Sequence, residues 1–337
     1  MNLARYALRR LLLIVPVLVG VSLLTFALSR VVPGDPARLA AGAQATPEMY
    51  EQIRREFGLD DPLPVQYWTY VSGLVRGDWG DSILSRRPVA ADLRLYWPAT
   101  LELVLVAMTI AVAVGVPLGV LSAIRADRPT DQVSRLVSLL GVSMPAFWLA
   151  LLLQIFFGLR LGWLPVSGRL DPMLGAPSGG TGLVLVDAAL AGNWAMVRDA
   201  LAHVVLPALT LSFPALATIA RFTRASLLEV LGNDYVRTAR AKGLVERRVI
   251  FGHGLRNAFI PTLTMIGLSF GWAMGGSVLV ETVYDWPGIG LYATRSALTL
   301  DFMPIMGIAL LYGVVFSLIN IAVDVAYGVL DPRVSHA

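Results

Sequence analysis

Lysine is nearly absent from this chain of 337 residues, and its one position decides which nucleotide chemistry is open to the protein. Lys242 is the only lysine among 27 basic residues. A phosphate-binding P-loop needs a lysine followed by serine or threonine after a glycine-rich turn, because the ammonium group and the backbone amides together hold the phosphates. Here Gly243 follows Lys242. The sequence therefore offers no Walker-type nucleotide site, and any ATP that drives the protein must be hydrolysed by a partner.

The sequence also has few residues that could act in catalysis or bind a metal. The chain has no cysteine, which excludes disulfides and thiolate metal sites, and its three histidines, His203, His253 and His336, are too scattered to indicate a cluster. An intramembrane enzyme would need paired catalytic groups at one depth, but the topology predicted from the apolar runs places His203 and His253 on opposite faces of the membrane. We therefore expect no catalytic residue, no bound metal and no cofactor, and predict that the chain is not an enzyme.

The most basic segment, residues 221–256, has the start and stop signals of a short helix. Asn233 and Asp234 can cap its first turn. Gly243 permits a left-handed stop, and the turn before it carries Arg240 and Lys242 where the helix dipole favours cations. We expect a short exposed helix that ends at Gly243. The basic residues of the segment are Arg221, Arg224, Arg237, Arg240, Lys242, Arg247, Arg248 and Arg256.

Two kinds of partner could be recognised by this helix. The small side chains of Ala239 and Ala241 would let its backbone sit close inside a groove on another protein, while its arginines pair with acidic groups at the rim. Basic loops next to a membrane also commonly lie on anionic lipid headgroups. The residue types alone leave both interpretations open.

The elements that must position this segment are apolar helices. Of the residues, 56% are hydrophobic and 15% are charged, whereas soluble domains have roughly 25% charged residues. A helix needs about 20 apolar residues to cross a bilayer, where backbone polar groups must be satisfied internally. The fourth run is short and contains Pro207 and Pro214, which predicts an irregular helix. Another uncharged stretch, 172–186, is rich in Gly and Pro and is interpreted as a loop or surface segment. The six uncharged runs that qualify are 11–29, 103–124, 136–159, 204–220, 257–280 and 302–323.

The distribution of arginine predicts the orientation of these six spans. Short cytoplasmic loops carry an excess of basic residues, and the first run is expected to stay as an uncleaved anchor. With the N-terminus inside, the short outer loops hold only Arg160, Arg169, Arg198 and Arg295. Both termini are therefore expected in the cytoplasm, and the basic residues act as topology signals, which argues against a nucleic-acid partner. The cytoplasmic segments hold the basic group of residues 221–256 together with Arg5, Arg9, Arg10, Arg125, Arg128, Arg135 and Arg333.

The first external loop, residues 31–100, is too long for a simple connection. Thr46 and Pro47 start a helix, and Gly58 is a plausible stop. A second helix is predicted over residues 65–75 and ends at Gly77. Either a small packed cap or a docking surface would account for the loop.

Four ionisable side chains lie near the ends of the apolar runs. Glu102 and Glu281 are expected at the external interface, where water reaches them, and a structural or solvated role is favoured over substrate contact. Arg135 lies at a cytoplasmic end. Asp324, also near a cytoplasmic end, is interpreted as a helix-packing residue.

Short motifs run nearly from end to end of the chain. The segment Asp234-Tyr235-Val236-Arg237-Thr238-Ala239-Arg240-Ala241-Lys242-Gly243 resembles the cytoplasmic signature, EAA followed by three residues and Gly, of the permeases of binding-protein-dependent ABC importers. Only Ala239 and Gly243 match the general consensus. The consensus also ends in Leu-Pro, whereas this chain has Leu255-Arg256 there and its next proline is Pro261. Both departures are usual for the dipeptide and oligopeptide permeases of the DppB and OppB type. Further matches are Pro33-Gly34-Asp35-Pro36, Gly77-Asp78-Trp79-Gly80-Asp81-Ser82, Leu161-Gly162-Trp163-Leu164-Pro165, Trp286-Pro287-Gly288-Ile289-Gly290 and Asp331-Pro332-Arg333.

This resemblance implies a type I importer (MetI-like) permease fold with six transmembrane helices and an external helical loop domain. The implied organisation is an anchor segment at 1–30, the external loop domain at 31–100, a permease core at 101–328 with a coupling helix at about 233–243, and a cytoplasmic tail at 329–337. By resemblance, the residues that dock the ATPase are Asp234, Tyr235, Arg237, Thr238, Ala239, Arg240, Ala241, Lys242 and Gly243.

The resemblance also implies a function and partners. The chain would be one of two homologous permease subunits in the cell membrane, working with two ATP-binding subunits and an extracytoplasmic peptide-binding protein to import short peptides. Relatives that carry nickel chelates, glutathione or other small solutes leave the substrate open. A self-contained secondary transporter or channel would need ionisable groups near the midplane, and the predicted spans have none.

Glycines in the second and fifth runs are spaced to let helices approach closely. They could pack helices within one subunit. Alternatively, the fifth run lines a pathway between two permease subunits, and Ser269, Trp272 and Met274 are the candidate lining residues. The glycines are Gly115, Gly119, Gly267, Gly271, Gly275 and Gly276.

Overall fold

The protein is an all-helical membrane protein. The computed structural model describes residues 3–31, 36–42, 45–175 and 179–330, and these ranges contain helices but no β-strand. Five helices are long and apolar enough to cross a bilayer, and a bent pair supplies a sixth crossing if its two parts form one span. The prediction of an all-α membrane protein is confirmed. The long helices are α1 (Leu3–Val31), α5 (Val89–Ile124), α9 (Trp194–Leu231), α12 (Arg256–Val283) and α14 (Phe302–Leu330).

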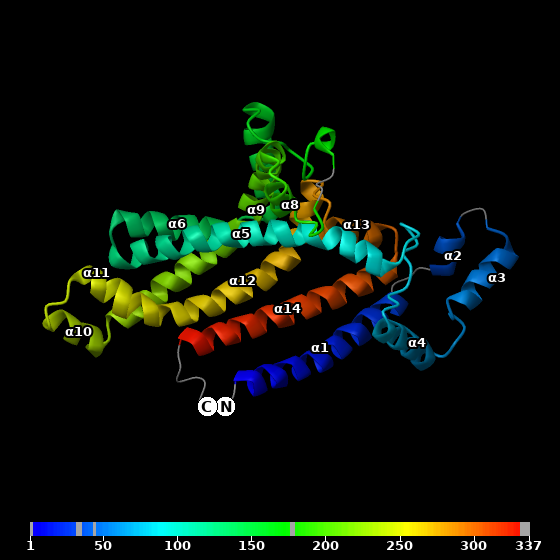
Figure 1. Ribbon diagram of the computed structural model, residues 1–337, viewed down its shortest axis with the longest axis horizontal. Helices are drawn as coiled ribbons and strands as arrows, with labels where there is room; N and C mark the ends of the chain where they lie inside the picture. Colours follow the sequence, from blue (N-terminus) through cyan, green and yellow to red (C-terminus); the bar gives the residue numbers. More distant parts are fainter. Residues whose placement is uncertain (1–2, 32–35, 43–44, 176–178, 331–337) are drawn as a thin grey trace.

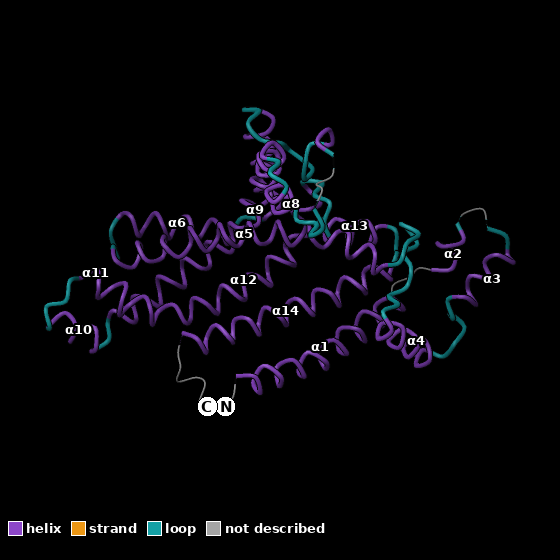
Figure 2. Tube along the Cα trace, in the orientation of Figure 1, coloured by secondary structure: helices purple, strands orange, loops and turns teal. Residues whose placement is uncertain are grey.

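The long helices form an elongated bundle with two distinct ends (Figures 1 and 2). Helices α5 and α9 pack along much of their length and form the core with α12, while α1 lies beside α14 and runs antiparallel to it. The short helices α10 (Asp234–Ala241) and α11 (Glu246–Arg248) lie at one end of the bundle, and α13 (Ile289–Leu298) and α4 (Leu63–Arg76) lie at the other. We call these the α10 end and the α13 end.

Glycine allows the closest helix contacts. A Cβ atom at Gly119 of α5 would lie 2.5 Å from the carbonyl oxygen of Ala220 in α9, and one at Gly115 would lie 3.0 Å from that of Leu216. In α12, Gly267 and Gly271 face side chains of α14 in the same way. These four glycines therefore pack helices of the same subunit against each other.

The third predicted span is broken, which corrects the expectation of one helix over residues 136–159. Helix α6 (Pro129–Ser143) and the pair formed by α7 (Ala146–Leu153) and the π-helical η1 (Gln154–Arg160) meet at an angle of 106°. The cause is Pro145, because a residue before proline is driven out of the helical region, and Met144 has an extended backbone. The segment from α7 to α8 (Val184–Leu190), drawn in green, projects to one side of the bundle (Figure 1).

The fourth span is longer than the apolar run of residues 204–220. Helix α9 has 38 residues and continues through both Pro207 and Pro214. At 1.5 Å per residue its length is about 57 Å, compared with about 30 Å for the hydrocarbon core. The apolar run underestimated α9 because charged residues such as Arg198 and Arg221 end a hydropathy count without ending a helix.

The two helices predicted in the first loop are present. Helix α3 (Pro47–Glu56) starts at Thr46, whose hydroxyl accepts a hydrogen bond from the Met49 amide, and Gly58 follows with a φ of 59°. Helix α4 ends at Gly77, with a φ of 85°. A further helix, α2 (Pro36–Ala41), precedes them. Helix α5 begins at Val89, so residues assigned to the loop up to 100 form the first turns of a long helix. Residues 33–35 of the first motif, the whole motif at 331–333, most of the tail and His336 lie outside the described residues.

The Trp286-Pro287-Gly288-Ile289-Gly290 motif joins α12 to α13, and Glu281 holds it in place. The Glu281 side chain is completely buried; it accepts hydrogen bonds from the Thr100 hydroxyl at 2.8 Å and from the Gly290 amide at 2.6 Å. A Cβ at Gly290 would lie 2.6 Å from the Val278 Cα. The indole of Trp286 donates to the Ala99 carbonyl at 2.9 Å. Glu281 thus caps the amino end of α13.

The expectation that water reaches Glu102 and Glu281 is therefore wrong. Glu102 is also buried, and its carboxylate pairs with Arg169 at 2.5 Å and accepts the Leu185 amide at 2.7 Å. Both carboxylates hold loops of the α13 end against α5, which is the structural one of the two roles that the sequence favoured. The sequence could not separate a buried carboxylate from a solvated one because the donors come from distant segments.

Candidate functional site

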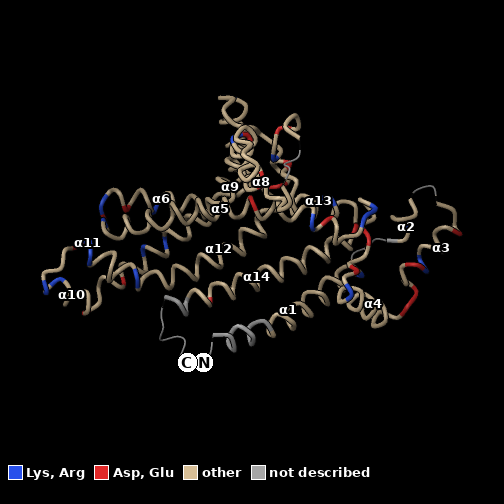
Figure 3. The backbone as a smooth tube through the Cα atoms, viewed as in Figure 1, with Lys and Arg blue, Asp and Glu red and all other residues tan. Residues whose placement is uncertain are grey.

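Helix α10, the candidate docking element, lies at the end of the bundle where basic residues gather (Figure 3). One face of this helix is buried: Val236 and Ala239 pack with Val249 of η3 (Val249–Leu255), and Leu231 and Leu244 cover them. Ala239 was expected to give a partner close access to the backbone. Its small side chain instead lies in this internal cluster.

The predicted left-handed stop at Gly243 is confirmed. Gly243 has a φ of 77°, its amide donates to the Arg240 carbonyl at 2.9 Å, and the Leu244 amide donates to the Ala239 carbonyl at 3.3 Å. This pair of hydrogen bonds is the Schellman arrangement. At the start of α10, Asn233 has the extended backbone of a capping residue, but its side chain makes no capping hydrogen bond.

The other predicted docking residues form the exposed face of α10. Asp234, Tyr235, Arg237, Thr238, Arg240, Ala241, Lys242 and Gly243 are all exposed. Together they give one face of a short helix with several cationic groups. The arrangement can contact a partner through the helix surface, and no covalent chemistry is needed.

The two arginines of α10 differ in their surroundings. Arg240 makes a forked contact with the carboxylate of Glu246, with a closest distance of 2.8 Å, and this hydrogen bonding raises the pKa of Arg240 above its usual value. Arg237 has only a 3.5 Å contact with Asp234, and both side chains are largely exposed. Arg237 is therefore the more available of the two for an acidic partner.

A hydrogen bond that the sequence did not predict joins α10 to α12. The side-chain amide of Asn257, in the first turn of α12, donates to the hydroxyl of Tyr235 at 2.8 Å and to the carbonyl of His253 at 3.2 Å. No spacing rule links residues this far apart, so only the fold reveals the contact. It connects the exposed helix to the long element that reaches Glu281 at the opposite end.

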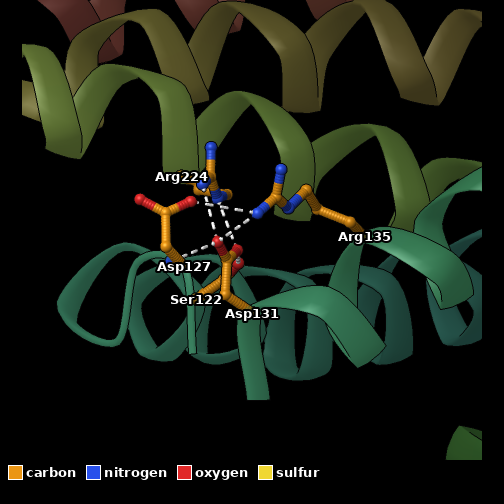
Figure 4. Close-up of polar contacts among 5 residues, drawn as sticks. All are labelled: Ser122, Asp127, Asp131, Arg135 and Arg224. Atoms are coloured by element: carbon orange, nitrogen blue, oxygen red, sulfur yellow. Dashed lines mark hydrogen bonds and ion pairs between the residues drawn. The ribbon is translucent and has the colours of Figure 1, made fainter. Parts of the chain in front are cut away.

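A buried carboxylate fixes the α5–α6 turn at the same end of the bundle (Figure 4). Asp131 of α6 is fully buried, and its two oxygens accept hydrogen bonds from Arg224 of α9 at 2.7 and 2.8 Å. Arg135 and the Ser122 hydroxyl also donate to it, at 3.0 and 2.5 Å. The sequence singled out Arg135 and Arg224 as topology signals and passed over Asp131, because a count of positive charges ignores their acidic partners.

The three candidate pathway residues do not share a face of α12. The side chains of Ser269 and Met274 are buried within the subunit, and Met274 belongs to the main hydrophobic core. Trp272 is 81% exposed. Of these three side chains, only that of Trp272 can therefore contact another molecule in this conformation.

In the described part of the chain, no three His, Asp or Glu side chains are grouped so as to hold a metal ion. His203 is buried and contacts Asp199 of its own helix at 3.2 Å, whereas His253 lies in η3 at the α10 end.

The chain is similar in sequence to a known family of membrane proteins. Residues 115–336 match the family described as binding-protein-dependent transport system inner membrane component, and residues 3–88 match the N-terminal family of the same transport systems. The chain belongs to this family. Its members are components of transport systems, and the multi-pass arrangement of the permease agrees with an inner-membrane location. The N-terminal match ends at residue 88, directly before α5 begins at Val89.

Curated relatives of this permease extend over nearly its whole length. The chain is 45% identical to the probable D,D-dipeptide transport system permease protein DdpB of Escherichia coli K12, over 95% of this chain and 94% of the relative. It is 44% identical to the di/tripeptide transport system permease protein DppB of Pseudomonas aeruginosa, over 97% and 98%. It is also 41% identical to the glutathione transport system permease protein GsiC of Escherichia coli K12, over 98% and 99%.

Proposed function

We propose that the chain is a permease subunit of an ABC importer that takes up short peptides, and that α10 is its coupling helix. The observation that carries the proposal is the geometry of α10: a short helix held on its inner face by Val236 and Ala239, stopped at Gly243, and exposed on its cationic face. Such a helix suits a groove on a separate ATPase, which supplies the nucleotide site that the sequence lacks.

The partners follow from this assignment. A second, homologous permease completes the pathway, two ATP-binding subunits dock on the coupling helices, and an extracytoplasmic binding protein delivers the peptide. The basic α10 end faces the cytoplasm, with both termini on that side, because cytoplasmic loops are enriched in arginine and lysine (Figure 3).

The contacts of α10 suggest how a movement would be transmitted. The hydrogen bond between Tyr235 and Asn257 ties α10 to α12, and the Asp131–Arg224 pair ties the α5–α6 turn to α9. These helices pack against each other, so a shift of α10 moves them as a body, as in rigid-body switching of packed elements. The ATPase cycle would open and close the pathway in this way.

The substrate class rests on the relatives. Permeases named for dipeptides and for di- and tripeptides align over nearly the full chain, and so does one named for glutathione, itself a small peptide-like solute. Short peptides are therefore the favoured class, with glutathione as the alternative and a nickel chelate or another small solute as a more distant one.

Reconstitution tests the proposed function directly. In proteoliposomes, uptake of a labelled dipeptide is expected only when this chain is combined with its sister permease, the two ATPases, the binding protein and ATP. Radioactivity trapped in the vesicles is the measurement. Transport by this chain alone would instead identify a secondary transporter or channel and contradict the proposal.

Trp272 is proposed as a residue of the pathway between the two permeases, supported by its exposure on α12. A cysteine at this position, in a chain that has none of its own, should change its rate of maleimide labelling by several-fold between the ATP-bound and nucleotide-free complex. Labelling that stays constant through the cycle would rule out this role.

A further inference from the structure

A small cavity at the α13 end has features of a docking socket. Its volume is about 200 Å³, and it opens beside the turn between α12 and α13. Small-molecule sites usually have volumes of roughly 300–1,000 Å³, so this cavity fits a single side chain better than a whole substrate. Its lining residues are Tyr96, Asp285, Pro287, Gly288, Leu291, Tyr292 and Arg295.

Asp285, at the rim of this cavity, places a negative charge at the carboxyl end of a helix. Helix α12 ends at the capping residue Tyr284. The next residue, Asp285, has a left-handed backbone with a φ of 46°. The Trp286 amide then donates to the Glu281 carbonyl at 2.9 Å and closes the end of the helix. Glycine usually fills the left-handed position. Aspartate is one of the few non-glycine residues that adopt this backbone readily, so the unfavourable feature here is its negative charge at the carboxyl end of a helix.

The ion pair made by Asp285 does little to offset the unfavourable contribution of its charge to stability. Arg295 contacts the Oδ1 atom of Asp285 through one nitrogen at 3.0 Å, and the two side chains are 57% and 67% exposed. Exposed pairs of this kind contribute little to stability. The second oxygen of the carboxylate remains open to a partner's donor, so binding explains the presence of Asp285 better than folding does.

The aromatic wall of the cavity favours a cation. The rings of Tyr96 and Tyr292 stack with centroids 4.9 Å apart, and the Tyr292 hydroxyl is held by Asp92 at 2.8 Å. A guanidinium or ammonium group is attracted both to the face of an aromatic ring and to a carboxylate, which makes it the group that suits this rim and wall. Leu291 supplies an apolar surface for the methylene stem of such a side chain.

We infer that this cavity receives an arginine or lysine side chain of the extracytoplasmic binding protein. The inference rests on the proposed function, which places the α13 end on the outer side of the membrane. A protein side chain is favoured over the substrate because of the small volume of the cavity and because α13, which lines it, lies at the α13 end of the bundle (Figure 1). The socket would fix the orientation of the docked binding protein.

The test measures docking of the cognate, peptide-loaded binding protein to the complete complex in nanodiscs by surface plasmon resonance. That binding protein is identified as the one that supports uptake by the reconstituted complex. Asp285→Asn keeps a residue that tolerates left-handed backbone and removes only the charge. Docking would bury the carboxylate against the partner's cation, so this change is expected to weaken Kd by roughly thirtyfold or more and to reduce its salt dependence.

Asp127 provides a matched control. It also has a left-handed backbone, with a φ of 62°, and pairs with an arginine, Arg135, at 3.3 Å, but it lies at the α10 end. Asp127→Asn should leave Kd unchanged. Asp285→Gly should weaken docking like Asp285→Asn while the Tm of the complex stays equal or rises, because glycine suits the left-handed position.

Three outcomes would overturn the inference. Unchanged docking of Asp285→Asn would remove the role of the carboxylate. Tighter docking of Asp285→Asn together with weaker docking of Arg295→Gln would mean that the cavity receives an anion. Loss of uptake with unchanged docking would assign the carboxylate to the substrate or to the sister permease. Failure of the unmodified complex to dock any binding protein would instead count against the proposed function itself.

Discussion

Replacing Gly243 with Val is expected to uncouple uptake from ATP hydrolysis, so that the reconstituted complex takes up much less peptide for each ATP that it hydrolyses. Gly243 has a φ of 77°, and a Cβ built on it meets no atom within 4 Å, so the effect comes from the backbone and not from a clash. A left-handed conformation costs an L-residue about 1–2 kcal/mol, and more when the side chain is β-branched. The chain would leave the left-handed region, the hydrogen bond from Leu244 to Ala239 would be lost, and α10 would change its angle to α12.

The measurement is the ratio of labelled dipeptide taken up to phosphate released in proteoliposomes. A shift of about 1.4 kcal/mol changes the population of the correctly ended helix by roughly tenfold, so the ratio should fall by about that factor. Gly243→Asn is the matched control, because asparagine tolerates the left-handed region, and it should keep most of the coupling. An uptake ratio for Gly243→Val equal to that of the unmodified complex would show that the stop does not position α10.

Local signals allowed α10 to be predicted from the sequence, whereas its surroundings required the fold. A capping position at Asn233 and a glycine at 243 act within a few residues of the chain, and the helix lies between them. The packing of Ala239 inward and the bond between Tyr235 and Asn257 depend on how α9 and α12 meet. A single sequence carries no direct sign of such contacts.

For the membrane spans too, local sequence signals predicted some features, whereas others required the fold. A count of apolar residues finds helices but not their ends, because α5 and α9 continue past the apolar runs through charged residues. The break at Pro145 did have a local signal, since Met144 precedes a proline. A hydropathy count does not read that signal. Asp131 was missed as an anchor, and the burial of Glu281 was not predicted, because their donors Arg224 and Thr100 lie far away in the sequence.

Charge reversal at Arg237 is expected to release the ATPase subunits from the permease, and reversal at Arg240 to act for a different reason. A double reversal of both residues would mix two effects, because Arg240 is already paired with Glu246 at 2.8 Å, whereas Arg237 has only a 3.5 Å contact with the exposed Asp234. When docking buries an arginine against a partner's carboxylate, removing the arginine's charge weakens the binding free energy by about 2 kcal/mol or more. This corresponds to a loss of affinity of roughly thirtyfold.

The expected result of Arg237→Glu is therefore a large loss of ATPase co-purified with the tagged permease in detergent. Arg240→Glu would place two negative charges together and disturb the turn after Gly243, so its effect alone does not identify a docking contact. Exchanging the pair, with Arg240→Glu and Glu246→Arg in one chain, restores the internal attraction between these side chains while it reverses their positions. If Arg240 serves the turn and Arg237 the docking surface, the exchanged chain should retain the ATPase and Arg237→Glu should lose it. Retention of the ATPase by Arg237→Glu, with loss in the exchanged chain, would assign the docking contact to Arg240.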